Sequence, residues 1–290
     1  MPGPYTTLIS VAELQALQAS GQPLLVFDCS FDLMQPASGR AQFEAGHIAG
    51  AVYADLNQDL SAGHDSVEAA SGGRHPLPSR AAFAAWLGLV GFDNSMQAVV
   101  LDRQGVNYCG RLWWMLKWAG HQNVAVLDGG YAAWLAAGGA TASGAAYVRP
   151  PRRFELGPAC LRLTDVSTVE QQLGRPTQHI LDARAAARFR GEVEPVDPVA
   201  GHIPGALNRP FVNNLDASGK FKPAADLRAE FEALLGGRAS ADVVHHCGSG
   251  VSAVPNILAM EIAGLNGSAL FAGSWSEWIS DPARPVAQGW

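Results

Sequence analysis

The sequence contains few cysteines and no paired cysteine motif. Four cysteines are spread over 290 residues, at positions 29, 109, 160 and 247, and no two of them form a Cys-x-x-Cys pair. This spacing argues against a disulfide framework and is typical of a chain kept in a reducing cytosol. We therefore expect a cytoplasmic protein with free thiols, and we expect neither a metal nor another cofactor.

The sequence also lacks an excess of positive charge and a long apolar run. Its net charge of −6 argues against a surface that binds nucleic acid or an anionic membrane. The longest nearly uncharged apolar stretch, residues 81–92, is shorter than the ~20 residues that a membrane-spanning helix needs. The first five residues lack the basic region and apolar core of a secretory signal. We expect no nucleic-acid partner and no membrane partner.

What the chain does contain is an internal repeat. An acid that ends an apolar strand, Asp28, returns as Asp182, and the glycine–histidine turn 46–51 returns as 201–206. From about residue 99 onward, the two copies match at an offset of 144 residues. Each copy alternates strands with helices, which predicts an α/β fold with a parallel sheet flanked by helices.

Composition and length support two such domains. Apolar residues make up 48% of the 290 residues, which is enough for two hydrophobic cores. A stretch rich in Gly, Ala and Pro separates the copies and indicates a linker. We expect the first domain over residues 1–140, the linker over 141–157 and the second domain over 158–290.

One cysteine lies in a stretch that favours its ionised form. The sequence predicts a strand at 243–244 and a helix over 254–264, with Cys247 in the turn between them. Gly248 and Gly250 let successive backbone N–H groups point inward, and the helix N-terminus adds roughly half a positive charge. Both effects favour the thiolate, so Cys247 is the candidate nucleophile. The alternative is a structural thiol packed at the end of a strand.

The repeat allows a comparison of this turn between the two copies. At an offset of 144, Cys247 is opposite Arg103, and the first copy has no thiol in the turn. Cys109 comes six residues later, at the start of an expected helix that ends at Trp118, where we expect it to serve packing. We infer that the first copy is catalytically inactive and that the second copy carries the chemistry.

With these features the chain resembles the tandem-domain rhodanese-like sulfurtransferases over nearly its full length. The resemblance rests on three motifs, which are Cys247–Ala253, Gly201–Ala206 and Gly273–Trp278. The first is similar to the active loop of the 3-mercaptopyruvate sulfurtransferases, with Ser252 where Thr is usual. The resemblance implies that a sulfane sulfur moves from 3-mercaptopyruvate through a persulfide on Cys247 to an acceptor. It implies cyanide or a thiol such as thioredoxin or glutathione as that acceptor.

The resemblance also implies roles for individual residues. Ser249 and His75 match a serine and a histidine that relay a proton in the family, which makes both catalytic residues beside Cys247. Arg188 matches one of two arginines that bind the carboxylate of the donor. The remaining substrate-binding residues implied by the loop are Gly248, Gly250, Val251 and Ser252.

Two positions depart from the family pattern. The acid that partners the histidine matches Asn57, with Asp55 and Asp59 on either side as candidates for that role. The second carboxylate-binding arginine matches Asp197, which reverses the charge. Arg74, next to His75, is a candidate source of the missing positive charge.

Three other functions are compatible with a cysteine in such a turn. A thiosulfate:cyanide sulfurtransferase (rhodanese) is one alternative, although Gly248 and Ser249 lack the cationic side chains of thiosulfate-preferring relatives. A non-catalytic protein that binds or relays a persulfide is another. A cysteine phosphatase is disfavoured, because it needs an arginine six residues after the cysteine and this chain has Ala253. Turnover of a small sulfur donor separates the enzyme from the relay.

Overall fold

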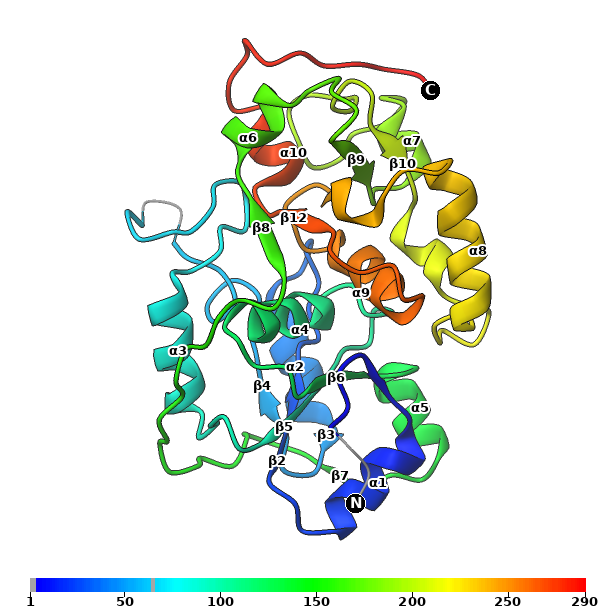
Figure 1. The fold of residues 1–290 in the computed structure, drawn as a ribbon. Coiled ribbons are helices and arrows are strands. Elements are labelled where there is room, and N and C mark those ends of the chain that lie inside the picture. The colour runs from blue at the N-terminus through cyan, green and yellow to red at the C-terminus, as the bar shows by residue number, and fades with distance from the viewer. Residues whose placement is uncertain (1–3, 64–65) are drawn as a thin grey trace. The chain divides into compact units, whose positions relative to one another are not determined.

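The computed structural model describes residues 4–63 and 66–290, which form two compact units (Figure 1). The first unit contains the described residues up to 62 together with 78–160 and 217–221. The second contains the described part of 63–77 together with 161–216 and 222–290. The sequence did not predict this exchange of two short segments, and its domain limits at 140 and 158 stay a prediction.

The first unit is built on a five-stranded parallel sheet with the strand order β1-β6-β5-β2-β4. These strands are β1 (Leu8–Ile9), β2 (Leu24–Asp28), β4 (Val52–Tyr53), β5 (Gln97–Leu101) and β6 (Val124–Leu127). A separate antiparallel pair joins β3 (His47–Ile48) to β7 (Thr141–Ala142). The helices are α1 (Val11–Ala19), α2 (Ala37–Ala45), α3 (Arg80–Leu89), α4 (Cys109–Trp118) and α5 (Gly130–Ala136). The parallel sheet and the expected helix from Cys109 to Trp118 are thus both present.

The second unit repeats this plan with the strand order β10-β9-β11-β12-β8, and its strands are again all parallel. They are β8 (Arg162–Thr164), β9 (His179–Asp182), β10 (Leu207–Asn208), β11 (Val243–His246) and β12 (Ala269–Phe271). The helices are α6 (Val166–Gln171), α7 (Ala186–Phe189), α8 (Ala224–Leu235), α9 (Val254–Ile262) and α10 (Ser274–Trp278). Two 3₁₀ turns are η1 (Phe211–Asn214) and η2 (Ser240–Asp242). The strand β11 is central, so residues at its carboxyl end have neighbours on both sides.

The central strand of each sheet is fully buried, which accounts for its short apolar run in the sequence. Every residue of β5 and of β11 is buried, as expected for strands of a parallel sheet covered on both faces. Two histidines fix the repeated turns, because His47 Nδ1 and His202 Nδ1 each lie 2.8 Å from a backbone carbonyl oxygen. Each ring also stacks on a phenylalanine. These histidines therefore have structural partners.

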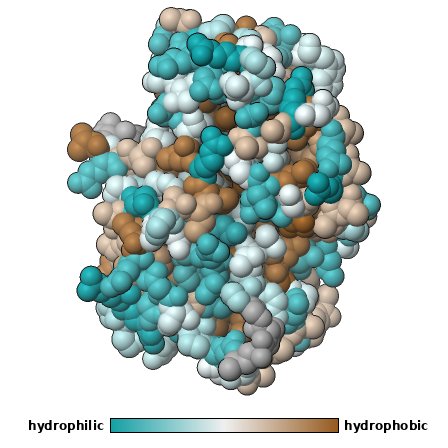
Figure 2. All heavy atoms as spheres, in the orientation of Figure 1, coloured by the Kyte–Doolittle hydropathy of each residue, from teal (hydrophilic) through white to brown (hydrophobic). Residues whose placement is uncertain are grey.

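Polar residues cover much of the face drawn in Figure 2, with smaller hydrophobic patches among them. The large apolar side chains lie mostly inside the units, where five tryptophans are almost fully buried. They are Trp113, Trp114, Trp134, Trp275 and Trp278. Within the described part of the chain, no helix has both the length and the apolar character needed to cross a membrane.

Candidate active site

Cys247 directly follows β11, in a loop that leads into α9. Ligands of open parallel sheets bind at the carboxyl ends of the strands, where this loop lies. The cysteine is only 2% exposed. Gly250 adopts a φ of +73°, and a Cβ atom there would lie 2.1 Å from the carbonyl oxygen of Ala272. The loop therefore needs glycine at this position, as we expected from the tight turn after Cys247.

The start of α10 holds the backbone of this loop in place. The N–H of Cys247 donates to Ser274 Oγ at 3.1 Å, and its carbonyl oxygen accepts from the N–H of Trp275 at 3.0 Å. The carbonyl oxygen of Gly248 accepts from the N–H of Ser276 at 2.9 Å. These contacts fix the outward-facing polar groups and leave the inner side of the loop for a ligand.

Three backbone N–H groups of the loop have no acceptor in the described part of the chain. Among the described residues, none accepts a hydrogen bond from the N–H of Gly248, Ser249 or Val251. Successive unpaired N–H groups at the start of a helix form a site for an anion. A thiolate or persulfide on Cys247 is such an anion.

The first unit corrects the predicted match between the two copies. The N–H of Trp275 donates to the carbonyl oxygen of Cys247, and the N–H of Tyr131 donates to that of Asp102 in the same way. The repeated bonds make Asp102 the counterpart of Cys247, so the predicted match with Arg103 was wrong. The first copy has one residue more between the paired positions, which shifts the offset at the turn to 145.

Asp102 fills its own loop with a carboxylate. Its Oδ1 accepts from the N–H groups of Gln104 and Val106, both at 3.0 Å. Its Oδ2 accepts from those of Tyr108 at 2.8 Å and Cys109 at 2.9 Å. The turn in the first unit therefore binds an anion through four backbone N–H groups. The turn in the second unit has a cysteine in place of that anion.

A guanidinium lies beneath each of the two loops, but it comes from a different position in each. In the first unit, Arg103 pairs with Asp28 at 2.9 Å. In the second unit, Arg184 pairs with Asp182 at 2.6 Å. Although burial opposes it, His246 and Arg184 lower the pKa of Asp182. In the second unit the guanidinium comes from Arg184, which lies outside the loop. The position that corresponds to Arg103 therefore needs no charge, and Gly248 occupies it.

His75 and Ser249 form a hydrogen-bonded pair in the second unit. His75 Nδ1 lies 2.8 Å from Ser249 Oγ, and both residues are 6% exposed. The segment that carries His75 lies against α10, because the N–H of Arg74 donates to Ser276 Oγ at 3.0 Å. Gly73, at a φ of +85°, packs so closely that a Cβ atom would lie 2.4 Å from the carbonyl oxygen of Gly273. The structure thus brings together two residues that are 174 positions apart in the sequence.

The two acids next to Asn57 stabilise a turn of the first unit. The Asp55 carboxylate accepts from the N–H of Asn57 at 2.8 Å and of Gln58 at 3.1 Å. The Asp59 carboxylate accepts from the N–H of Asp55 at 2.8 Å. Burial raises the pKa of Asp59. These bonds give both carboxylates a local role, and their relation to His75 stays a prediction.

Two arginines and two acids gather beside Gly248. Arg188 Nη2 lies 2.6 Å from Glu194 Oε1 and 3.1 Å from Asp197 Oδ2. Arg74 Nη1 lies 2.5 Å from Asp197 Oδ1. Both acids are almost buried, whereas the arginine side chains keep 18–24% of their surface exposed. The partly exposed arginines and the buried acids together form a partly accessible charged patch beside the loop.

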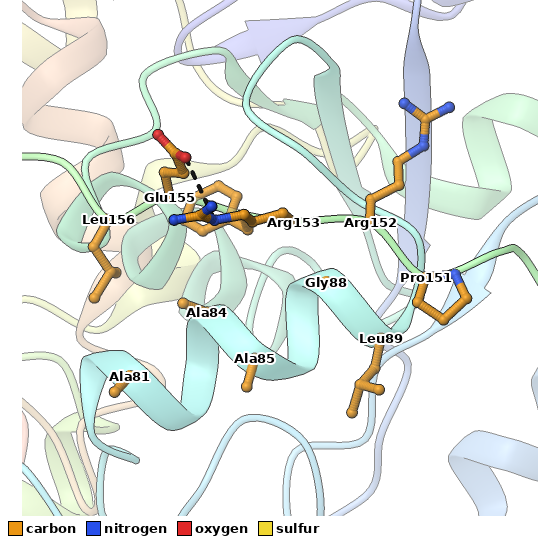
Figure 3. Close-up of a pocket in the computed structure, with 11 residues that line it drawn as sticks. Ala81, Ala84, Ala85, Gly88, Leu89, Pro151, Arg152, Arg153, Glu155 and Leu156 are labelled. Carbon is orange, nitrogen blue, oxygen red and sulfur yellow. Dashed lines mark ion pairs between the residues drawn. The ribbon is translucent and has the colours of Figure 1, made fainter.

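An open groove of about 690 Å³ lies in the first unit (Figure 3). It runs between α3 and residues 151–156, and an ion pair of Arg153 with Glu155 borders it. Its lining includes neither a nucleophilic thiol nor a histidine. None of the predicted site residues contributes to it.

Comparison with known proteins identifies the family. The model of the rhodanese-like domain matches the chain twice, over residues 10–137 and 165–281. The chain belongs to the rhodanese-like family. The two matches fall on the two copies of the internal repeat, and they confirm the predicted tandem rhodanese-like fold.

This rhodanese-like protein is similar to curated sulfurtransferases over nearly its full length. It is 47% identical to the Pseudomonas aeruginosa "Probable 3-mercaptopyruvate sulfurtransferase", covering 96% of this chain and 97% of that one. It is 34% identical to human 3-mercaptopyruvate sulfurtransferase, covering 95% and 91%. It is 32% identical to bovine thiosulfate sulfurtransferase, covering 98% and 96%. The predicted enzyme class, a sulfurtransferase, is confirmed.

A solved structure gives the same result for the fold. The 3-mercaptopyruvate sulfurtransferase from Leishmania major superposes with a TM-score of 0.82 at 29% identity, covering 98% of this chain and 77% of that chain. The rhodanese-like protein therefore shares its fold with a solved sulfurtransferase.

Proposed function

We propose that this sulfurtransferase takes sulfur from 3-mercaptopyruvate and passes it, as a persulfide on Cys247, to a thiol or to cyanide. The observation that supports this donor is the hydrogen bond between His75 and Ser249. Ser249 lies two positions after the proposed nucleophile Cys247. Pyruvate leaves the donor sulfur as an enolate, which must gain a proton. Sulfite, the leaving group of thiosulfate, needs none, so a proton relay here favours 3-mercaptopyruvate.

In the first step, the Cys247 thiolate attacks the sulfur of 3-mercaptopyruvate. A sulfur–sulfur bond forms, the carbon–sulfur bond breaks, and its electron pair stays on carbon as the enolate. Ser249 gives its hydroxyl proton to that carbon, and His75 returns a proton to Ser249. The products are pyruvate and a persulfide on Cys247.

In the second step, an acceptor attacks the outer sulfur of the persulfide. The sulfur–sulfur bond breaks and Cys247 leaves as the thiolate, which the unpaired N–H groups of the loop stabilise. A thiol such as thioredoxin or glutathione becomes a persulfide, and cyanide becomes thiocyanate. In this proposal Gly248, Gly250, Val251 and Ser252 bind the donor, and Arg188 belongs to the charged patch beside the loop.

We also propose that the first domain is catalytically inactive and that the protein acts in the cytoplasm. The turn of the first domain holds the Asp102 carboxylate where a nucleophile would be. The two cysteines near it, Cys29 and Cys109, are buried, and burial raises the pKa of both thiols well above their usual range. All four cysteines are free, which is typical of a reducing compartment.

The experiment that tests the proposal is steady-state sulfur transfer to cyanide with each donor in turn. We expect kcat/KM to be much higher with 3-mercaptopyruvate than with thiosulfate, and Cys247→Ser to abolish both activities. A higher value with thiosulfate would make the protein a thiosulfate:cyanide sulfurtransferase. If the wild type turns over neither donor but still carries a persulfide, the persulfide relay becomes the better proposal.

A further inference from the structure

The two arginines beside Gly248 differ in which of their donors are engaged. Arg188 presents its Nε and Nη2 to Glu194, at 3.0 and 2.6 Å, in the two-bond geometry with which an arginine holds a carboxylate. The same Nη2 also donates to Asp197 at 3.1 Å. This edge of Arg188 is therefore already filled by an acid of the protein itself, and only its Nη1 is left without a partner among the described residues.

Arg74, in contrast, has most of its donors free to bind a ligand. Only its Nη1 is engaged, with Asp197, while its Nε and Nη2 have no partner among the described residues. Its Nη2 lies 3.1 Å from the position that a Cβ atom on Gly248 would occupy, against 3.7 Å for Arg188 Nη2. Its side chain is 24% exposed, whereas its Nε is buried without an acceptor. A buried donor without a partner is costly, so a ligand that supplies an acceptor is favoured.

We propose that Arg74, rather than Arg188, binds the carboxylate of the sulfur donor, and that Asp197 positions its guanidinium against the active loop. The inference rests on the proposed function, because it concerns the carboxylate of 3-mercaptopyruvate. It explains the charge reversal at position 197. Asp197 does not replace a substrate-binding arginine but anchors one that comes from another segment of the chain. Arg188 then serves as the positioning residue that holds Glu194 and Asp197.

The test compares two donors that differ only in the carboxylate. These are 3-mercaptopyruvate and 1-mercapto-2-propanone, in which a methyl group replaces the carboxylate. The readout is the ratio of their kcat/KM values. For Arg74→Met we expect this ratio to fall roughly 10- to 100-fold, as for the loss of a hydrogen bond between charged groups. For Arg188→Met we expect both values to fall while the ratio stays close to that of the wild type.

Arg190→Met is the matched control, because Arg190 lies two residues from Arg188 and pairs with the exposed Glu192. Its ratio and its rates should equal those of the wild type. Arg74→Lys keeps the charge and should give an intermediate ratio, and thermal unfolding of each variant separates loss of binding from loss of folding.

A fall of the ratio in Arg188→Met but not in Arg74→Met would overturn the inference and leave the proposed function intact. A wild type that turns over neither donor would instead overturn the proposed function. In that case calorimetry with pyruvate, which carries the same carboxylate, decides about Arg74. Weaker binding by Arg74→Met supports the inference, and equal binding rejects it.

Discussion

Replacing Cys247 by Asp should abolish sulfur transfer and at the same time stabilise the second unit. The first unit shows the reason, since Asp102 at the matching position accepts four backbone N–H groups at 2.8–3.0 Å. Within residues 4–63 and 66–290, the N–H groups of Gly248, Ser249 and Val251 have no such acceptor. A carboxylate at position 247 would supply one.

The magnitude follows from the bonds gained and the burial of the charge. A hydrogen bond to a charged group contributes about 1.5–3 kcal/mol net. Ser249 and Val251 lie at the positions of Gln104 and Val106, so about two of the four bonds should form in the second loop. Burying the carboxylate at this almost inaccessible position costs several kcal/mol. We expect a net gain of about 1–2 kcal/mol over Cys247→Asn, which has the same shape without the charge. For a domain of this size that corresponds to a Tm higher by roughly 2–8 °C.

Two measurements check this expectation. Differential scanning calorimetry compares the Tm of Cys247→Asp with that of Cys247→Asn at pH 7. Amide hydrogen exchange reports whether the N–H groups of the loop become protected in the Asp variant, which separates a local effect from a global one. A lower Tm for the Asp variant, or unchanged exchange of the loop, would refute the idea that the loop is built to hold an anion.

Three further predictions concern single residues of the second unit. His245 is buried with no partner for either ring nitrogen among the described residues, and burial lowers its pKa to about 3. His245→Leu should therefore raise the free energy of unfolding by about 1–3 kcal/mol, and a loss of stability would contradict this. Burial raises the pKa of Glu194, but its hydrogen bonds, that from Arg188 foremost, outweigh this and lower it. Its stabilising effect is present above the usual value of 4.5 and is lost as the pH falls through the lowered pKa. Between pH 7 and 3, the Tm of Glu194→Gln should thus fall less steeply than that of the wild type, and parallel curves would refute the assignment. Ser249→Ala should lower kcat with 3-mercaptopyruvate about 100-fold and affect thiosulfate much less, whereas equal losses would rule out a role in proton transfer.

Much of the fold could be predicted because its signals are local. The capping box of Ser10 and Glu13 is present at the start of α1. The apolar runs became the central strands of two parallel sheets, since a strand covered on both faces reads as a continuous apolar run. The place of Cys247 between a strand and a helix was also predictable, because the glycines, the end of the strand and the start of the helix around it are visible in the sequence.

The match between the copies was wrong for a physical reason. The structure pairs Val99 with Ala125 and Val244 with Ala269, so Val99 corresponds to Val244, one position further than expected. At an offset of 144 both Val99 and Val100 match valines, whereas at 145 Val100 falls on His245. Residue identity therefore favoured the wrong offset, because a buried apolar strand carries little mark of its register. The strand pairing and the hydrogen bonds to the carbonyl oxygens of Cys247 and Asp102 together decide between the two offsets.

The position of Arg74 was not predictable either. It lies in a stretch rich in Gly, Ser and Ala that has no periodic apolar pattern, and local sequence does not state which domain such a segment contacts. The structure assigns the segment to the second unit through backbone contacts, such as the N–H of Arg74 with Ser276. The sequence already offered Arg74 as a candidate for the missing positive charge, and the tertiary contact was needed to place it against Asp197.

The two turns of this chain illustrate how one backbone supports either structure or chemistry. Both turns direct N–H groups inward at the end of a central strand, and both rest on a guanidinium paired with a buried acid. In the first, Asp102 accepts from four of these N–H groups, which leaves the turn without an open site for an anion. In the second, the proposed mechanism uses the N–H groups to hold the thiolate or the persulfide of Cys247. The same N–H groups that would stabilise the fold are thereby kept for the reaction, which is why the Asp variant should gain stability as it loses activity.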